Sequence, residues 1–364
     1  MLVCPLDWGL GHTTRCIPLI RQLMGLGCEV IIGCNSTQKE ILFLEFQDHC
    51  RYIHLAGYGI LYGKTRGATL ARLMLQSLKI LIRIKQENRW LRTFLLQEGV
   101  NAVISDNRFG LYATGLPSIF ITHQLQIKTG LGQRADALVR RWNYRHINRF
   151  TTCWVPDEAG APSLSGELSH PRIMPSLPVR YIGALSRMAT CSVAGKGLLL
   201  IILSGPEPLR SIFEQVLLEQ LKDYTGQVVM VRGLPLATAL PTTPDHCKLL
   251  NHAPADMLQA LICEAELVIS RCGYTTVMDL FLMGKKSILV PTPGQAEQEY
   301  LAHHLLQQQW AYTLPQKGFQ LDRALEEAGK FTYKIPDLPK DAYKEVVREF
   351  VEGMERPAVG SRES

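Results

Sequence analysis

Short apolar runs alternate along the chain with longer segments in which apolar residues recur every three or four positions. A short continuous apolar run is typical of a buried strand, and the wider spacing is typical of an amphipathic helix. The apolar runs fall at 2–5, 29–34, 102–105, 118–122 and 153–155, and then at 198–203, 228–231, 267–270 and 287–291. Because strands and helices alternate, the pattern predicts parallel sheets joined by right-handed crossovers.

The longest helical pattern covers residues 68–97 and ends before Gly99, a typical C-terminal stop. Its helically spaced apolar residues are Leu70, Leu73, Met74, Leu78 and Leu81. Further helices are predicted at 208–222, 255–265, 275–283 and 340–354. The polar tail SRES is expected to be disordered.

Residues 183–197 separate the two sets of strands and are small and polar, as suits a linker. The length of 364 residues also favours two domains. We therefore predict an α/β protein with two Rossmann-like, doubly wound domains facing a cleft. The predicted parts are an N-terminal domain (1–182), a linker (183–197), a C-terminal domain (198–340), and a C-terminal helix with a flexible tail (341–364). Ligands of such sheets bind at the carboxyl ends of the strands.

The composition is ordinary for a compact globular protein, with 46% apolar and 20% charged residues, and it excludes a disordered chain. No run approaches the roughly 18 apolar residues that cross a bilayer, and the N-terminus lacks the pattern of a secretory signal. We therefore expect a cytoplasmic protein. Ten scattered cysteines without a C-x-x-C pair predict free thiols, and we expect neither a metal site nor a cofactor.

Residues 9–15 read GLGHTTR and follow the first strand. A dinucleotide-binding loop would need glycine at position 14 and an acid after the second strand, whereas this chain has Thr14 and Asn35. What remains is a turn, with Gly9 and Gly11, that places backbone N–H groups and the imidazole of His12 at the sheet edge. His12 would take a proton from a substrate hydroxyl, or it would only form local hydrogen bonds.

Two other polar side chains follow strands of the N-terminal domain. Asp106 comes directly after the strand at 102–105, and His123 follows the strand at 118–122. Each is a rival candidate for the base, or for contacts to the hydroxyls of a second substrate. The alternative for each is a side chain that caps a strand-to-helix turn.

The strongest signal is the segment SRCGYTTVMDLFLMGKKSILVPTPGQAEQEYLAHH, residues 270–304. Two helices begin there after adjacent strands, near Thr275 and Gln295, and two helix starts at one crevice suit a diphosphate. Asp279 would accept hydrogen bonds from ribose hydroxyls. The alternative is a capping box formed by Thr276 and Asp279, which needs no ligand.

This segment resembles the C-terminal signature of glycosyltransferase family 28, the MurG-like enzymes with a GT-B fold. The positions that match are Arg271, Gly273, Thr276, Asp279, Gly284, Pro291 and Gln298. The resemblance implies that Asp279 contacts the ribose of a UDP-sugar and that Gln298 contacts the sugar hydroxyls. Asp279 stands where the family has glutamate, and Glu299 replaces a second glutamine, so the identity of the sugar stays open.

The resemblance also implies where other parts of the two substrates bind. Ser204 and Gly205 lie where the family has a phosphate loop, although Pro206 and Pro208 remove backbone donors there. Residues 251–254 lie where the family's uracil-binding loop would be. Residues 1–182 would bind the acceptor, with Gly9, Gly11 and His123 on the acceptor side.

These residues predict an inverting glycosyltransferase. His12 or Asp106 would deprotonate an acceptor hydroxyl, which attacks the anomeric carbon of a UDP-sugar such as UDP-N-acetylglucosamine while UDP leaves. The helix starts near Thr275 and Gln295 would stabilise the departing charge. The chain has no Asp-x-Asp, so the scheme requires no divalent metal. The family resemblance makes a lipid-linked or cell-envelope glycan the candidate acceptor.

Two alternative functions stay open. The pattern Gly-x-Gly-His-x-x-Arg at residues 9–15 also resembles the loop of UDP-sugar hydrolases of the nonulosonate pathway, in which water replaces the acceptor. A non-catalytic nucleotide-sugar binding protein is the third hypothesis.

Two stretches, 64–92 and 134–149, concentrate the basic residues of a chain whose formal net charge is +6. The basic residues are Lys64, Arg66, Arg72, Lys79, Arg83, Lys85, Arg89 and Arg92, and then Arg140, Arg141, Arg145 and Arg149. Apolar side chains lie among them, which is typical of contact with an anionic membrane surface but equally of a solvated helix face. Neither stretch contains a nucleic-acid-binding module, so nucleic acid is not expected as a partner.

Overall fold

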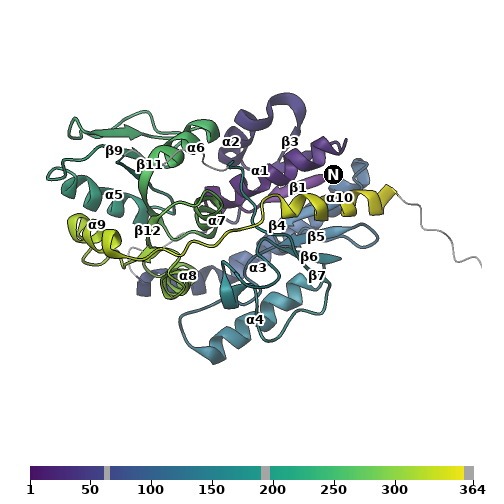
Figure 1. The fold of residues 1–364 in the computed structure, drawn as a ribbon. Coiled ribbons are helices and arrows are strands. Elements are labelled where there is room, and N and C mark those ends of the chain that lie inside the picture. The colour runs from purple at the N-terminus through teal and green to yellow at the C-terminus, as the bar shows by residue number, and fades with distance from the viewer. Residues whose placement is uncertain (61–65, 190–196, 356–364) are drawn as a thin grey trace, which may run out of the picture.

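A computed structural model describes residues 1–60, 66–189 and 197–355. It contains two parallel sheets side by side, each flanked by helices (Figure 1). We call the first sheet with its helices the N-terminal lobe, and the second sheet with its helices the C-terminal lobe. Some predicted features lie outside the described residues. They are the tail SRES, residues 190–196 of the predicted linker with Cys191, and Lys64.

The N-terminal lobe is built on seven parallel strands in the order β3-β2-β1-β4-β5-β6-β7. The strands are β1 Leu2–Pro5, β2 Ile31–Cys34, β3 Arg51–His54, β4 Val103–Asp106, β5 Ser118–Ile121, β6 Thr152–Val155 and β7 Val179–Tyr181. The helices are α1 Leu10–Gly25, α2 Ser36–Phe46, α3 Arg66–Gln97 and α4 Gln133–Ile147. In the register, Pro5 pairs with Asp106 and Asp106 pairs with Ile121, so three central strands end in one line.

The C-terminal lobe repeats this plan with six parallel strands in the order β10-β9-β8-β11-β12-β13. The strands are β8 Leu198–Ile202, β9 Val228–Val231, β10 Cys247–Leu250, β11 Ala265–Arg271, β12 Ser287–Val290 and β13 Tyr312–Thr313. The helices are α5 Leu209–Gln220, α6 Ala255–Glu264, α7 Tyr274–Leu282, α8 Ala296–Gln307 and α9 Leu321–Lys330.

The last helix, α10 Ala342–Glu355, returns to the N-terminal lobe and lies beside α1 (Figure 1). The ring of Phe350 packs edge-on against Trp154 of β6 at 5.4 Å between ring centroids. Arg180 at the end of the same sheet forms an ion pair with Glu349. One buried apolar cluster contains residues of both lobes and of α10, among them Ile17, Tyr274 and Val347. The lobes therefore share part of their core.

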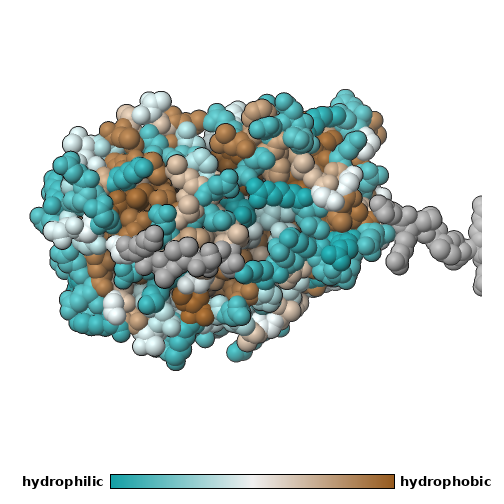
Figure 2. All heavy atoms as spheres, turned by 45° about the horizontal axis from the view of Figure 1, so that its top comes forward, coloured by the Kyte–Doolittle hydropathy of each residue, from teal (hydrophilic) through white to brown (hydrophobic). Residues whose placement is uncertain are grey.

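Apolar positions in α3 do not all face a core. Leu78 is 70% exposed, and Leu75 and Ile82 are 81% and 56% exposed. The side chains of residues 66–74 lie outside the described part. Elsewhere the surface mixes both kinds of residue, and Figure 2 shows a face on which hydrophobic patches are interspersed with hydrophilic side chains.

Two compositional expectations are tested directly. Eight cysteines are free thiols, but Cys263 is disulfide-bonded, so the prediction of free thiols is wrong at that position. Spacing along the sequence does not show which thiols meet in the folded chain. Within the described residues, no helix combines the length and the apolar character that a membrane span requires.

Candidate functional site

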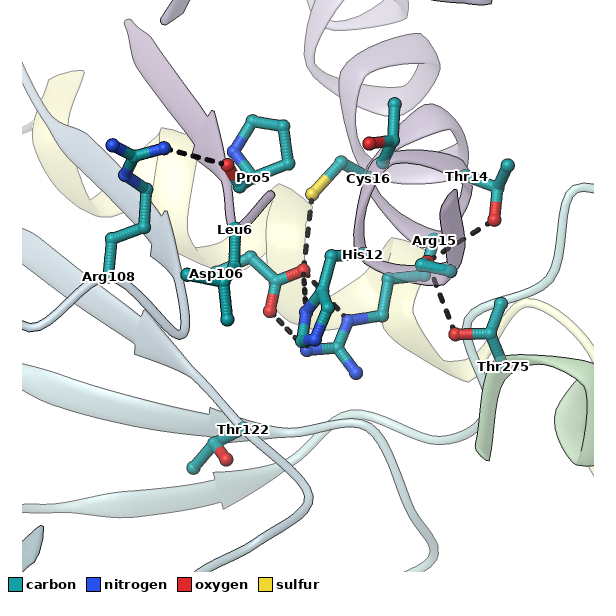
Figure 3. Close-up of polar contacts among 12 residues, drawn as sticks. Pro5, Leu6, His12, Thr14, Arg15, Cys16, Asp106, Arg108, Thr122 and Thr275 are labelled. Carbon is teal, nitrogen blue, oxygen red and sulfur yellow. Dashed lines mark hydrogen bonds and ion pairs between the residues drawn. The ribbon is translucent and has the colours of Figure 1, made fainter. Parts of the chain in front are cut away.

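The candidate site lies where β1, β4 and β5 end and where α1 begins. Of the predicted residues, the structure brings His12, Asp106 and His123 into one hydrogen-bonded group. Arg15, in the first turns of α1, lies at its centre. Figure 3 shows how the side chains of His12 and Arg15 converge on Asp106.

The loop before α1 meets the C-terminal lobe directly. Gly9 caps the helix with φ +85°, a conformation that side chains other than glycine rarely adopt. The Thr275 hydroxyl, in the first turn of α7, donates to the Gly11 carbonyl at 3.2 Å. A Cβ at Gly11 would lie 2.9 Å from that hydroxyl oxygen. Glycine at position 11 therefore permits the contact between the lobes.

Asp106 is an ionised carboxylate held by arginine. Its side chain is 1% exposed, and that of Arg15 is 2% exposed. Arg15 Nε donates to Oδ2 at 2.8 Å and Nη2 donates to Oδ1, a bidentate pair. Burial alone would raise the pKa of Asp106, but the charges of Arg15 and His12 outweigh it and hold that pKa well below its usual range. Asp106 is thus a weak proton acceptor.

His12 lies over this ion pair with its side chain 16% exposed. Its Nδ1 is 3.2 Å from Asp106 Oδ2 and 2.9 Å from Arg15 Nη2. Burial and the positive charge of Arg15 lower the pKa of His12, and Asp106 partly opposes them. The imidazole is therefore neutral at neutral pH. Its Nδ1 cannot both donate to Asp106 and accept from Arg15. When the proton is on Nδ1 and points at Asp106, the lone pair lies on Nε2, which no described protein group contacts.

His123 has both ring nitrogens occupied. Arg15 Nη1 lies 3.3 Å from Nδ1, and Glu297 Oε1 lies 2.8 Å from Nε2. Arginine only donates, so Nδ1 accepts and the proton of the neutral ring is on Nε2, pointing at the carboxylate. The ring also stacks on Tyr274 of α7 at 4.0 Å, with 8° between the planes. His123 therefore has no nitrogen left for a substrate proton.

Glu297 and Tyr274 are two residues of this site that the sequence interpretation passed over. Glu297, in the first turn of α8, accepts from His123 and from Gln124 across the lobes. The Tyr274 hydroxyl donates to the Pro156 carbonyl at 2.7 Å, inside the N-terminal lobe. The sequence held one signal for these two residues, which is that each is adjacent to a position of the matched segment. Tyr274 directly follows Gly273, and Glu297 directly precedes Gln298.

In the C-terminal lobe, Arg271 ends β11 as a buried cation. Its Nη2 donates to the Leu209 carbonyl at 2.9 Å and to Gln316 Oε1 at 2.8 Å. The guanidinium also lies over the ring of Phe213 at 4.3 Å. Burial lowers the pKa of Arg271 to about 10. Arg271 thus orders the start of α5 and the neighbouring loop.

Gln298 and Glu299 face their own loop between β12 and α8. The Gln298 carbonyl oxygen accepts from the Thr292 backbone N–H at 2.8 Å, and its Nε2 donates to Gln295 at 2.6 Å. Glu299 accepts from the Gly294 N–H at 3.1 Å. Both side chains hold the loop from which α8 begins.

The start of α7 has no side-chain cap. Its N-cap is Gly273, so Thr276 lies inside the helix and the alternative of a Thr276–Asp279 capping box is wrong. The reason is that the helix begins at Tyr274, one residue earlier than predicted. Asp279 instead accepts from the Ser186 hydroxyl at 2.5 Å. Burial raises the pKa of Asp279 to about 6, although Ser186 and Arg187 oppose the shift.

Next to Ser186, a cavity of about 260 Å³ lies between the lobes. It is lined by Arg187, His252, Pro254 and Ala255, among others, and by residues of α1 and α2. Arg187 pairs with Glu45 at 3.2 Å, and its buried Nε has no hydrogen-bond partner among the described residues. The predicted loop at 251–254 thus contributes to a lined cavity close to Asp279.

Ser204 and Gly205 follow β8 and face the loop after β12. Gly205 has φ +103°, and a Cβ there would lie 3.8 Å from the Thr292 hydroxyl. The loops after β8 and β12 therefore meet at the carboxyl edge of this sheet, and the described residues give neither α7 nor α8 a side-chain cap. Their first backbone N–H groups are available to an anion.

The C-terminal part of the chain is similar to a known family. Residues 205–350 match the glycosyltransferase family 28 C-terminal domain. A UDP-N-acetylglucosamine--N-acetylmuramyl-(pentapeptide) pyrophosphoryl-undecaprenol N-acetylglucosamine transferase of Rhodopseudomonas palustris (strain HaA2) is 29% identical over 209 residues, 54% of this chain and 55% of that protein. The homonymous protein of Bradyrhizobium diazoefficiens is 39% identical over 72 residues, 20% of its length. This chain thus matches about half, or less, of these relatives' length, and the predicted resemblance to MurG-like proteins is confirmed.

Solved structures show the same architecture. Spinosyn rhamnosyltransferase SpnG complexed with thymidine diphosphate superposes with a TM-score of 0.60 at 15% identity, over 97% of this chain and 95% of that one. Phytolacca americana UGT2, complexed with UDP-2fluoro-glucose and pterostilbene, gives 0.58 at 12% identity, over 98% and 94%. At these identities the likeness shows the fold, and the predicted GT-B arrangement of two Rossmann-like sheets is confirmed.

Proposed function

Because residues 205–350 form a glycosyltransferase family 28 C-terminal domain, we propose that the chain is an inverting glycosyltransferase that uses a UDP-sugar. The C-terminal lobe holds the nucleotide-sugar and the N-terminal lobe holds the acceptor. The observation that carries the proposal is that the start of α1 and the start of α7 are in contact between the two lobes. A neutral imidazole from α1 lies beside the uncapped start of α7, with Gly11 and Thr275 in contact.

The diphosphate is assigned to the carboxyl edge of the second sheet. The support is that α7 and α8 begin after neighbouring strands of this sheet without a side-chain cap, and that the turn at Gly205 approaches the loop before α8. Helix starts carry partial positive charge, which favours a diphosphate and also the negative charge that grows on UDP as it leaves. This scheme contains no step that requires a metal ion.

The nucleoside is assigned to the cavity beside Asp279. A carboxylate that already accepts from the Ser186 hydroxyl is suited to accept from ribose hydroxyls. The cavity that the neighbouring Arg187 lines is also lined by His252, Pro254 and Ala255, and the uracil ring is assigned to it. Gln298 and Glu299 would contact the sugar only after releasing the loop that they now hold.

We assign the role of base to His12 and a supporting role to Asp106. His12 is neutral near pH 7, and with its proton on Nδ1 toward Asp106 it has the lone pair on Nε2, which no described protein group contacts. Asp106 is saturated by Arg15, and the two nitrogens of His123 are both occupied. Among the three rival candidates, His12 is therefore the one able to accept a proton from an acceptor hydroxyl.

We further propose that the acceptor is lipid-linked and is met at the cytoplasmic face of an anionic membrane. The support comes from α3, where Leu75, Leu78, Ile82 and Lys85 recur at helical spacing and the three apolar side chains are exposed. Apolar side chains would enter the lipid interface while the basic residues of the stretch meet the anionic headgroups. The printed name of the R. palustris relative includes pyrophosphoryl-undecaprenol, a lipid.

Hydrolysis of a UDP-sugar is the second candidate. The observation that favours it is Arg15, the last residue of the Gly-x-Gly-His-x-x-Arg pattern, which contacts both His12 and Asp106. A water molecule would then take the place of the acceptor hydroxyl at His12.

Nucleotide binding and turnover decide among these functions. We expect UDP at one hundred times its dissociation constant to stabilise the folded chain by about 2.7 kcal/mol, seen as a higher melting temperature, with ADP as the matched control. UDP release from UDP-sugars without an acceptor would favour the hydrolase. Release only with a polyprenyl-linked glycan would favour the transferase, and binding without any turnover would leave a binding protein.

A further inference from the structure

The geometry points to Glu297 as a positioning residue of the base, through which the C-terminal lobe controls His12 in the N-terminal lobe. The contacts run from Glu297 to His123, from His123 to Arg15, and from Arg15 to Asp106 and His12. This inference rests on the proposed function only in naming His12 as the base. The connection itself is a property of the folded chain.

The hydrogen bonds at the two nitrogens of His123 have fixed directions. Arg15 donates through Nη1, so His123 must accept at Nδ1 and must carry its proton on Nε2, 2.8 Å from Glu297. If Glu297 could not accept, that proton would have no described partner, and only Arg15 would favour this tautomer. The carboxylate therefore stabilises the form of His123 that can accept from Arg15.

Arg15 is the shared member of both groups. One guanidinium contacts Asp106 through Nε and Nη2, His12 through Nη2, and His123 through Nη1. Because the guanidinium is planar and rigid, its orientation fixes all three contacts together. Rotation of Arg15 away from His123 would therefore also move the groups that surround His12 Nδ1.

Glu297 contacts the other lobe, whereas the next two residues of α8 do not. Gln298 and Glu299 face their own loop, whereas Glu297 accepts from His123 and Gln124 of the other lobe. Tyr274 of α7 covers the face of the His123 ring and donates to Pro156. The C-terminal lobe thus holds His123 from its edge and from its face.

The charge of Glu297 also reaches the base. The groups that face it are His123, Arg15 and His12 among the titratable ones, the Gln124 amide, and the buried thiol of Cys272. His12 and Glu297 stabilise each other's charged form, so a neutral residue at 297 makes His12 hold a proton less tightly. Glu297→Gln should therefore lower the pKa of His12 and weaken it as a base.

The test is ¹⁵N NMR of the full chain labelled at histidine, which separates Nδ1-protonated from Nε2-protonated rings without any substrate. We expect wild-type His123 to be Nε2-protonated. In Glu297→Gln, one carbonyl oxygen replaces the two carboxylate oxygens that accept from His123 and Gln124. We therefore expect mixed tautomers at His123 and a fall of about half a unit or more in the pKa of His12. Glu326→Gln on the exposed face of α9 is the matched control and should change neither ring. Spectra of His12→Asn and His123→Asn assign the signals.

An Nδ1-protonated His123 in the wild type would overturn the inference, as would unchanged signals from both rings in Glu297→Gln. If Glu297→Gln does not fold, Glu297→Asp and the wild-type tautomer decide the question.

With a UDP-sugar substrate, we expect Glu297→Gln to lower kcat about tenfold and to leave KM the same. The acid limb of its pH profile should move to lower pH. Absence of turnover in the wild type would reject the proposed function and leave the NMR result standing.

Discussion

The two lobes share one architecture but differ in what their strand ends present. At the edge of the first sheet, buried charged side chains contact one another, with Arg15 and Asp106 at the centre. At the edge of the second sheet, side chains such as Arg271 and Gln298 hold loops, and the uncapped helix starts are left open. In the proposed function, one fold would thus serve proton transfer through side chains in one lobe and anion binding through the backbone in the other.

Replacing the base tests the first lobe most severely. We expect His12→Ala to lower kcat by about 10²–10⁴-fold, because no other described group near the site has a free nitrogen or a suitable carboxylate. Binding of UDP should stay unchanged, since the donor site belongs to the other lobe. The measurement is steady-state kinetics beside a thermal shift with UDP. Full activity of His12→Ala would remove the contrast between the lobes.

Breaking the ion pair beneath His12 should mainly cost stability. Asp106→Asn leaves the buried Arg15 without its countercharge, and we expect the free energy of unfolding to fall by about 3–5 kcal/mol. Because the pKa of Asp106 is lower in the folded state, its contribution is present above the unfolded pKa and is lost as pH falls through the folded value. Urea unfolding at pH 7 and at about pH 2 should therefore show a smaller difference for the variant than for the wild type.

In the C-terminal lobe, a substitution should weaken ligand binding but stabilise the fold. The pKa of Asp279 is raised to about 6, so this group stabilises the fold at low pH and loses that effect as pH rises from about 4 to 6. Asp279→Asn should weaken UDP binding about tenfold while raising the free energy of unfolding at pH 7 by about 1–3 kcal/mol. Calorimetric titration and urea unfolding measure the two effects. A variant that binds UDP normally would exclude the ribose contact.

The contact between the lobes should show a smaller effect. Gly11→Ala places a methyl group 2.9 Å from the Thr275 hydroxyl, and we expect a loss of about 1–2 kcal/mol in the free energy of unfolding. Thr275→Ala removes that oxygen, so the double variant should be less destabilised than the sum of the single variants. Additive effects in urea unfolding would mean that the two residues do not meet in solution.

The exposed face of α3 should affect membrane binding alone. Leu75→Asp with Leu78→Asp should reduce sedimentation with vesicles of anionic lipid about tenfold, because both side chains are exposed. Turnover of a water-soluble acceptor should not change. Equal sedimentation of the variant and the wild type would leave α3 as a solvated helix face.

The sequence predicts the interior of each sheet far better than its edges. The strands that the apolar runs predicted, from β1 to β12, all lie inside the two sheets, within one or two residues of the predicted ends. The four strands that were not predicted are β3, β7, β10 and β13, which are the four edges. Strands that helices cover on both faces read as continuous apolar runs.

An edge strand does not need to be apolar at every position, because it is not covered on all sides. In β3, Arg51 and His54 are exposed, and in β10 the exposed Lys248 separates buried Cys247 and Leu249. Such short mixed segments become strands because a neighbour offers its backbone groups, and this information does not lie in the segment itself. Prediction from local pattern therefore stops at the interior strands.

The candidate site follows the same division. The rule that strand ends converge was enough to select His12, Asp106 and His123 from distant parts of the chain. Arg15 was visible only as part of a motif, and the partnership of Glu297 with His123 depends on how the two lobes meet. No spacing within one lobe reports that arrangement.

The return of α10 to the N-terminal lobe has a consequence for how the chain is made. α10 covers α1, and Phe350 packs on Trp154, yet these partners are separated by most of the chain. During synthesis, the first seven-stranded sheet emerges from the ribosome long before residues 342–355 exist to cover its outer helix. The apolar surface that α10 covers must therefore stay exposed until residues 342–355 have been synthesised.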